Sequence, residues 1–295
     1  MRRNRRHELC NNMAVEMEIL TEKQIVARIR EGAPFTAATG GGGLRLCIRA
    51  YGPVMATAIH DGHRVAAPLA GRMQVTEADR LFEEDPHTGT LAEAMDISLR
   101  VVDSRYCCDL NRSEQRCLYD EAWGKQVWRE PPGETDRQLL LSGHRRYYRI
   151  LDALLGELVE RFGAALLYDL HSYNYGRIDG SPPLFNIGTH YIDMQRFGPV
   201  VAHLMASLQA VAVPGIDNRT ACDEVFQGRG YQAEFVHTSH PDVLCVPLEL
   251  KKVYTDEAGA VVRDDVYGPL FAGTGRALKE TGAFFVETLG LKRGL

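Results

Sequence analysis

Histidines and carboxylates follow two apolar segments of the chain, at points where strands are expected to end. Residues 54–59 (VMATAI) lead into His60-Asp61-Gly62-His63, and residues 164–168 (AALLY) lead into Asp169-Leu170-His171-Ser172. Open α/β sheets gather such strand ends at one edge. Two histidines three apart, with a third about 110 residues later, could ligate a catalytic zinc, which takes three protein ligands and keeps one position open. Ordinary surface or core histidines are the alternative interpretation.

A third segment whose side chains could take part in binding or catalysis is Arg105-Tyr106-Cys107-Cys108-Asp109-Leu110-Asn111-Arg112. An arginine in this segment could hold a substrate carboxylate, since its fork of donors matches two carboxylate oxygens. A surface Asp–Arg ion pair is the alternative, and it would contribute little stability. No histidine adjoins Cys107 or Cys108 in the sequence, so we interpret both as small buried apolar residues and not as nucleophiles.

The segments that must position these residues alternate between strands and helices. Thr21 predicts the N-cap of a short helix. The four glycines 40–43 lack the Lys-Ser or Lys-Thr of a phosphate loop and predict a turn. Strands are predicted at 46–49, 54–59, from Val101 onward, at 164–168 and at 243–250 with a break at Pro247, and helices at 145–162 and 273–289. Apolar strands of this kind suit a sheet covered on both faces, so we predict one three-layer α/β domain over residues 1–295.

Composition and charge narrow the class of protein. The 295 residues are 45% hydrophobic and 25% charged, which excludes collagen-like and mostly disordered chains. A net charge of -5 argues against a nucleic-acid partner. No apolar run approaches the ~20 residues of a membrane helix. Seven cysteines without a CxxC pair fit reduced thiols and predict a cytoplasmic protein.

The N-terminus begins with a basic cluster, MRRNRRH, over residues 1–7. Polar residues follow where the apolar part of a signal peptide should stand, which argues against export. We expect residues 1–20 to form a frayed arm, with Met13 as an alternative start of the chain.

The segments HDGH (60–63), RYCCDLNR (105–112), YDLHSYN (168–174) and PLELKKVYTDE (247–257) together resemble the N-formylglutamate amidohydrolase, or deformylase, family. The resemblance runs from about residue 54 to 257, with a more distant similarity to zinc carboxypeptidases and aspartoacylase. It implies an αβα fold with a mixed central sheet, as in the zinc carboxypeptidase or phosphorylase/hydrolase-like fold. It also implies a zinc-dependent amidohydrolase for an N-acyl amino acid such as N-formylglutamate, with a place in histidine degradation.

Carried onto this sequence, the resemblance implies two zinc ligands, His60 and His171. The remaining ligand has two candidates. His63 occupies the position, three residues after the first histidine, where carboxypeptidase-type enzymes have a glutamate. Glu84 is the choice from the acidic segment further on, with its neighbour Asp85 next. Zinc accepts both nitrogen and oxygen ligands, so the sequence leaves both candidates open.

The resemblance also assigns roles around the metal. Glu249 would be the general base, and Asp169 would orient an imidazole ligand. The substrate would be contacted by Arg105, at the scissile carbonyl, and by Asn111, Arg112 and Arg177, at its carboxylate.

Two stretches bear on the substrate. The family's Gly-Gly-Tyr-x-Thr-Arg-His corresponds to residues 228–234 (GRGYQAE), which lack the Arg-His pair, so the amino acid and the acyl group stay open. Residues 186–190 (NIGTH) match better and suggest a pocket wall. The alternatives are a carboxypeptidase or aspartoacylase-like deacylase, and a metal-binding homologue without turnover. The expected partner is a small N-acyl amino acid, with no membrane or nucleic acid and an open oligomeric state.

Overall fold

The computed structural model describes residues 16–256, 259 and 261–292. Its strands are β1 Met17–Leu20, β2 Phe35–Thr39, β3 Leu44–Ile48, β4 Val54–Ala58, β5 Ile97–Val101, β6 Glu121–Ala122, β7 Lys125–Gln126, β8 Ala165–Tyr173, β9 Phe185–Ile187, β10 Thr220–Cys222 and β11 Val243–Lys251. Its helices are α1 Glu22–Glu31, α2 Ala67–Ala70, α3 Glu77–Glu83, α4 Thr88–Ala92, α5 Glu134–Phe162, α6 Met194–Gln209, α7 Tyr231–Ser239 and α8 Asp264–Thr288.

The described strands form one large mixed sheet and a small hairpin. The sheet order is β1-β2-β3-β5-β4-β8-β11-β9-β10, and β6 pairs only with β7. The central strands β5, β4, β8 and β11 are parallel, whereas β3 and β9 run antiparallel to them. Because the central strands are parallel, their carboxyl ends lie at one edge, where an open α/β sheet places its site.

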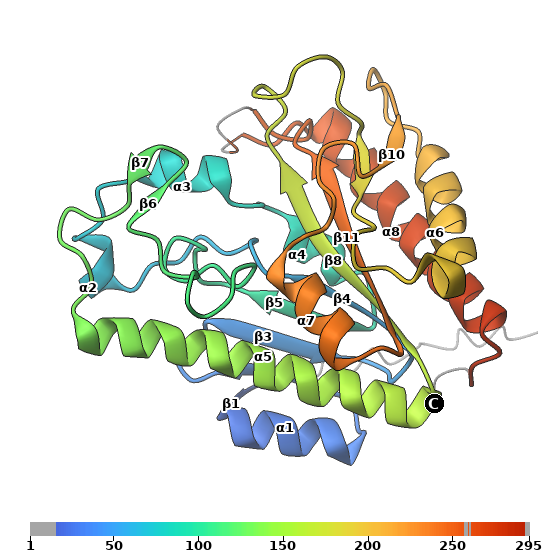
Figure 1. Ribbon diagram of the computed structural model, residues 1–295, viewed down its shortest axis with the longest axis horizontal. Coiled ribbons are helices and arrows are strands. Elements are labelled where there is room, and N and C mark those ends of the chain that lie inside the picture. Colours follow the sequence, from blue (N-terminus) through green and yellow to red (C-terminus); the bar gives the residue numbers. More distant parts are fainter. Residues whose placement is uncertain (1–15, 257–258, 260, 293–295) are drawn as a thin grey trace, which may run out of the picture.

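Helices cover both faces of this sheet. One core lies between the sheet and α1, α5 and α7, and the other lies between the sheet and α4, α6 and α8 (Figure 1). All nine residues of β8 are buried, as expected for a strand covered on both faces. The expected three-layer αβα architecture with a mixed central sheet is therefore confirmed.

Several local predictions are also confirmed. Thr21 caps α1, and its side chain and that of Gln24 each bond to the other residue's backbone. The glycine run makes the turn between β2 and β3, with positive φ at Gly41 and Gly42. The two predicted helices exist but begin earlier, at Glu134 and Asp264.

Other local predictions are wrong. Val101 ends β5 and does not begin a strand. β11 continues through Pro247, whose carbonyl accepts a hydrogen bond from the backbone of Gly188 on the β9 side. Residues 17–20 of the expected frayed arm form the edge strand β1, parallel to β2. Residues 1–15, including Met13, lie outside the described part. No helix among the described residues has the length and apolar character needed to cross a membrane.

Candidate metal site and substrate cavity

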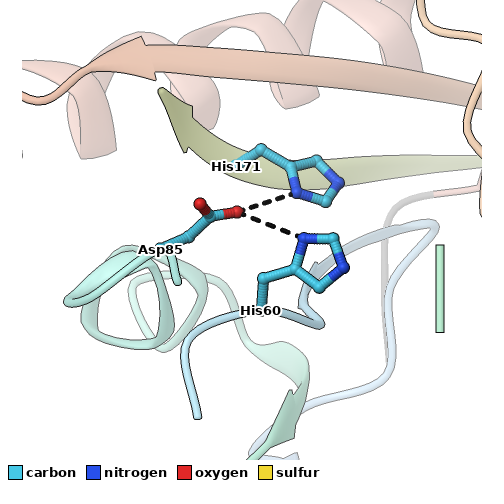
Figure 2. Close-up of side chains that lie close together, drawn as sticks. All are labelled: His60, Asp85 and His171. Carbon is cyan, nitrogen blue, oxygen red and sulfur yellow. Dashed lines mark hydrogen bonds and ion pairs between the residues drawn. The ribbon is translucent and has the colours of Figure 1, made fainter. Parts of the chain in front are cut away.

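Three buried side chains from separate segments meet at the carboxyl edge of the central strands. His60 follows β4, His171 lies on β8, and Asp85 lies between α3 and α4. One ligand atom from each lies within 4.8 Å of the others. The Asp85 Oδ2 atom lies 3.0 Å from the His171 Nδ1 atom and 3.4 Å from the His60 Nδ1 atom (Figure 2). The three side chains converge on one point.

This cluster fits a divalent metal ion. The Nδ1 atom of His60 is buried and has no hydrogen-bond partner, an arrangement that a bound cation would satisfy. Burial would raise the pKa of Asp85, but its hydrogen bond with His171 and its electrostatic attraction to His60 and His171 hold the pKa well below its usual range. The carboxylate is therefore charged. Two imidazole nitrogens and one carboxylate oxygen form a ligand set that zinc accepts.

Two further carboxylates lie against the outer nitrogens of the histidines. Asp109 Oδ1 lies 2.8 Å from the Nε2 atom of His60, within hydrogen-bond distance. Asp169 Oδ1 lies 3.0 Å from the Nε2 atom of His171, on the ring expected from the sequence. A carboxylate in this position fixes the orientation of a metal-binding imidazole.

The structure differs from the expectation for the remaining ligand, because neither His63 nor Glu84 joins the cluster. The Glu84 carboxylate instead contacts His63 Nδ1 and the hydroxyl of Ser104. Glu84 is the C-cap of α3 and has extended backbone angles. Successive side chains of an extended chain point to opposite sides, so Asp85 faces the histidines while Glu84 faces away. The backbone N–H of Asp85 donates to the carbonyl of His60 at 2.9 Å, which fixes this arrangement.

Glu249 reaches the cluster through strand register. β8 and β11 are parallel, and His171 is the register partner of Glu249. Burial, helped by the nearby charges of Asp85 and Asp169, raises the pKa of Glu249 to about 8 against the opposing charge of His171. A carboxylate with a raised pKa is a stronger proton acceptor, which suits acid–base chemistry near neutral pH.

Arg105 is held beside the cluster by Asp109. Its Nη2 atom lies 2.7 Å from Asp109 Oδ2, and its Nη1 atom donates to the carbonyl of Glu83 at 3.2 Å. The ion pair is buried, since Asp109 is fully inaccessible and the Arg105 side chain is 11% exposed. The sequence also allowed a solvated Asp–Arg pair for this segment, and the structure shows a buried one.

A cavity of about 590 Å³ opens over the cluster. Besides His60, Asp85 and His171, its lining includes each of the candidates assigned to catalysis or substrate binding, namely Arg105, Asn111, Arg112, Arg177 and Glu249. The Nη1 atom of Arg112 donates to the carbonyl of Asn111 at 2.9 Å, and the Nη2 atom of Arg177 lies 2.6 Å from Glu83 Oε1. His63 and Glu84 do not line this cavity.

The two stretches that bear on the substrate differ in their relation to the cavity, since none of residues 186–190 lines it. Gly228, Arg229 and Gly230 line the cavity, but Gln232, in the first turn of α7, is buried and its side-chain amide donates to the hydroxyl of Thr57 at 2.7 Å. Asn186 is fully buried and binds the backbone of residues 224–226 through both ends of its amide. It therefore fixes a segment whose residues 225 and 226 line the cavity.

Sequence reasoning missed the importance of Asp109 and Lys252. Lys252 is 4% exposed, and its ammonium group donates to the carbonyls of Phe82 at 2.8 Å and Glu84 at 2.5 Å. Burial lowers the pKa of Lys252 to about 8. Lys252 thus ties β11 to the segment that carries Asp85. A lysine two residues beyond the end of an apolar run gives no sequence signal for such a contact.

Comparisons with known proteins agree on a family. Residues 52–254 match the sequence model of N-formylglutamate amidohydrolases. The chain is 33% identical over 159 residues to the N-formylglutamate deformylase of Pseudomonas aeruginosa, covering 47% of this chain and 59% of the relative. It is 32% identical over 158 residues to that of Pseudomonas putida, covering 46% and 59%. The matches thus span less than two thirds of these relatives.

Solved structures show the same fold. An N-formylglutamate amidohydrolase from Ralstonia eutropha JMP134 superposes with a TM-score of 0.64 at 18% identity, covering 83% of this chain and 97% of that one. A protein from Agrobacterium tumefaciens superposes with a TM-score of 0.59 at 15% identity, covering 81% and 95%. At these identities the likeness concerns the fold alone.

Proposed function

The chain belongs to the N-formylglutamate amidohydrolase family, and from this premise we propose that it hydrolyses the amide bond of an N-acyl amino acid, with N-formylglutamate as the first substrate to test. The observation that carries the proposal is the convergence of His60, Asp85 and His171 in a cavity that Glu249 also lines. The named activity of the two Pseudomonas relatives supports it.

We propose that His60, Asp85 and His171 hold a zinc ion. The buried Nδ1 atom of His60, which lacks a hydrogen-bond partner, and the mixed nitrogen and oxygen donors support this choice. When bound, such an ion supplies Lewis acidity, which acidifies water and polarises a carbonyl oxygen. The hydrogen bond with Asp109 keeps the His60 imidazole in its ligating orientation, and Asp169 is an ion-pair partner for the His171 ring.

In this proposal Glu249 is the general base and later the general acid. Its carboxylate takes a proton from the attacking water, whose oxygen bonds to the acyl carbon. It then returns that proton to the leaving nitrogen as the amide bond breaks, which releases a carboxylic acid and a free amino acid. The raised pKa of Glu249, about 8, supports the role because a group that titrates near neutral pH can both take up and return a proton.

Three arginines and an asparagine supply the remaining functions. Arg105 stabilises the negative charge that develops on the carbonyl oxygen, and its ion pair with Asp109 keeps it oriented for that purpose. Arg112 holds the substrate carboxylate, for which its fork of donors is suited. Asn111 and Arg177, which line the same cavity, assist it.

The test is a substrate panel with metal control. Zinc-loaded protein is incubated with N-formylglutamate, N-acetylaspartate and a peptide with a free carboxyl end, and the release of free amino groups is measured. We expect release from N-formylglutamate, its loss after chelation and its return with zinc. Release only from the peptide or from N-acetylaspartate would favour a carboxypeptidase or an aspartoacylase-like deacylase. No release from any substrate would favour a homologue without turnover.

We further propose that the protein acts in the cytoplasm. The six cysteines in the described part of the chain are free, which suits a reducing compartment. Fractionation of the native host, followed by detection of the protein in each fraction, tests the location. The expected role in histidine degradation stays a prediction.

A further inference from the structure

Two exposed aromatic side chains line the substrate cavity. Large apolar side chains are exposed at seven positions of the described chain, and the aromatic ones among them are Trp123 and Phe226, at 39% and 41% exposure. Both belong to the cavity lining, although they come from distant segments. Aromatic rings in the wall of a concave site can bury their exposed surface against a bound ligand.

Trp123 occupies a turn position that disfavours a tryptophan. It joins β6 to β7 together with Gly124, and both residues have positive φ, at 49° and 74°. A two-residue turn of this kind prefers Asn-Gly, because a bulky residue at positive φ is strained. Figure 1 shows this hairpin outside the main sheet, beside α3. Strain of this type concentrates at functional sites.

Neighbouring side chains hold the indole of Trp123 in place. Its ring centroid lies 5.3 Å from that of Tyr106 and 5.6 Å from that of Tyr119. The guanidinium carbon of Arg105 lies 4.9 Å from the centre of the indole ring. These contacts give the cavity a rigid aromatic wall next to the arginine assigned to the scissile carbonyl.

Phe226 is fixed by different contacts. The side-chain amide of the buried Asn186 donates to its carbonyl at 2.7 Å. Its ring lies edge-on to Tyr173, with 5.6 Å between centroids. Its backbone is thus anchored while much of its side chain stays open to the cavity and solvent.

We propose that Trp123 and Phe226 form an aromatic subsite that binds a large apolar or aromatic side chain of the N-acyl amino acid. The inference rests on the proposed function and names the substrate class within it. A planar apolar group that packs against either ring in this cavity would bury its own surface and part of that ring, which is favourable. N-formylphenylalanine should then be a better substrate than N-formylalanine, by about 10-fold or more in kcat/KM.

The test compares these two substrates on zinc-loaded wild type and on Trp123→Asn. Asparagine suits the turn, so the variant removes the ring without demanding a new backbone. We expect the kcat/KM ratio of N-formylphenylalanine to N-formylalanine to fall by about 10-fold, with a Tm within about 3 °C of wild type. Trp123→Phe should restore most of the ratio. Met194→Ala, which removes an exposed apolar side chain outside the cavity, should leave the ratio unchanged.

Several results would overturn the subsite. An equal kcat/KM for both substrates in wild type would do so, and so would an unchanged ratio in both Trp123→Asn and Phe226→Ala. A lower Tm with an unchanged ratio would make Trp123 purely structural. If no N-formyl compound is hydrolysed, the proposed function fails, and calorimetric Kd values decide the subsite. A lower Kd for N-formylphenylalanine than for N-formylalanine would support it, and equal values would reject it.

Discussion

The contacts of Asp109 predict that its replacement by asparagine disturbs the metal site and the substrate cavity together. The carboxylate is fully buried and contacts His60 Nε2 at 2.8 Å, Arg105 Nη2 at 2.7 Å, the backbone N–H of Asn111 at 2.8 Å and the hydroxyl of Tyr119. Each of these groups can donate a hydrogen to it. Asparagine offers one acceptor oxygen, and its amide N–H group would have to face one of the donors.

The magnitude follows from these contacts. Because asparagine is neutral, the Arg105 guanidinium loses its counter-charge in either orientation of the amide, while only 11% of its side chain is exposed. Removing one partner of a buried ion pair costs about 3–5 kcal/mol, and we expect the lower end because Arg105 keeps a bond to the carbonyl of Glu83. If the oxygen moves to Arg105, His60 loses its orienting partner, which typically weakens metal binding by about 10- to 100-fold.

The assay compares the zinc affinity and the free energy of unfolding of Asp109→Asn with those of wild type. Metal affinity is obtained by competition with a chromophoric zinc chelator, and the free energy of unfolding by urea denaturation of metal-free protein. Asp242→Asn is the matched control, because Asp242 lies 2.7 Å from Arg196 in a solvent-exposed ion pair. Such a pair contributes about 0–1 kcal/mol. If Asp109→Asn matches wild type in both zinc affinity and unfolding free energy, the reasoning from buried contacts is refuted.

Three further predictions concern the proposed metal ligands, the general base and the substrate-binding arginine. Asp85→Ala should lose most of its zinc and His63→Ala should keep it, as measured by elemental analysis; the reverse result would restore His63 as a ligand. Glu249→Gln should keep its zinc while kcat falls by at least ~10², and a near-normal kcat would remove Glu249 as the base. Arg112→Lys should mainly raise KM because the bidentate fork is lost, so an unchanged KM would place the substrate carboxylate elsewhere.

The edge of the sheet that carries the site could be predicted from the sequence. The apolar runs before His60 and His171 gave the strands β4 and β8, and parallel packing brings their ends together. The pairing of β8 with β11 could not be read from local patterns. It places Glu249 beside His171 only because two strands 78 residues apart (249 − 171) share one register.

The choice between neighbouring carboxylates could not be predicted. Glu84 and Asp85 are adjacent in one acidic run, and composition does not separate them. What separates them is the extended backbone after α3, which points one toward Ser104 and the other toward His171. The role of Asp109 could not be predicted either. A short Arg-x-x-x-Asp spacing looks the same in the sequence whether the ion pair lies at the surface or in the interior.

The strand order has a consequence for how the chain is made. β8 lies between β4 and β11, and Thr57 on β4 faces Asp169 on β8 across 112 residues of sequence. During synthesis, β8 therefore emerges with its earlier neighbour already made but without β11, which is complete only at residue 251.

Until then, the apolar β8 has an open edge, the kind of surface that pairs with other chains. Long-range parallel pairing is also slow to form. The interval between the synthesis of β8 and β11 is thus the period of greatest aggregation risk for the nascent chain. Chaperone binding to the AALLY segment of the ribosome-bound chain is the protection we expect in that interval.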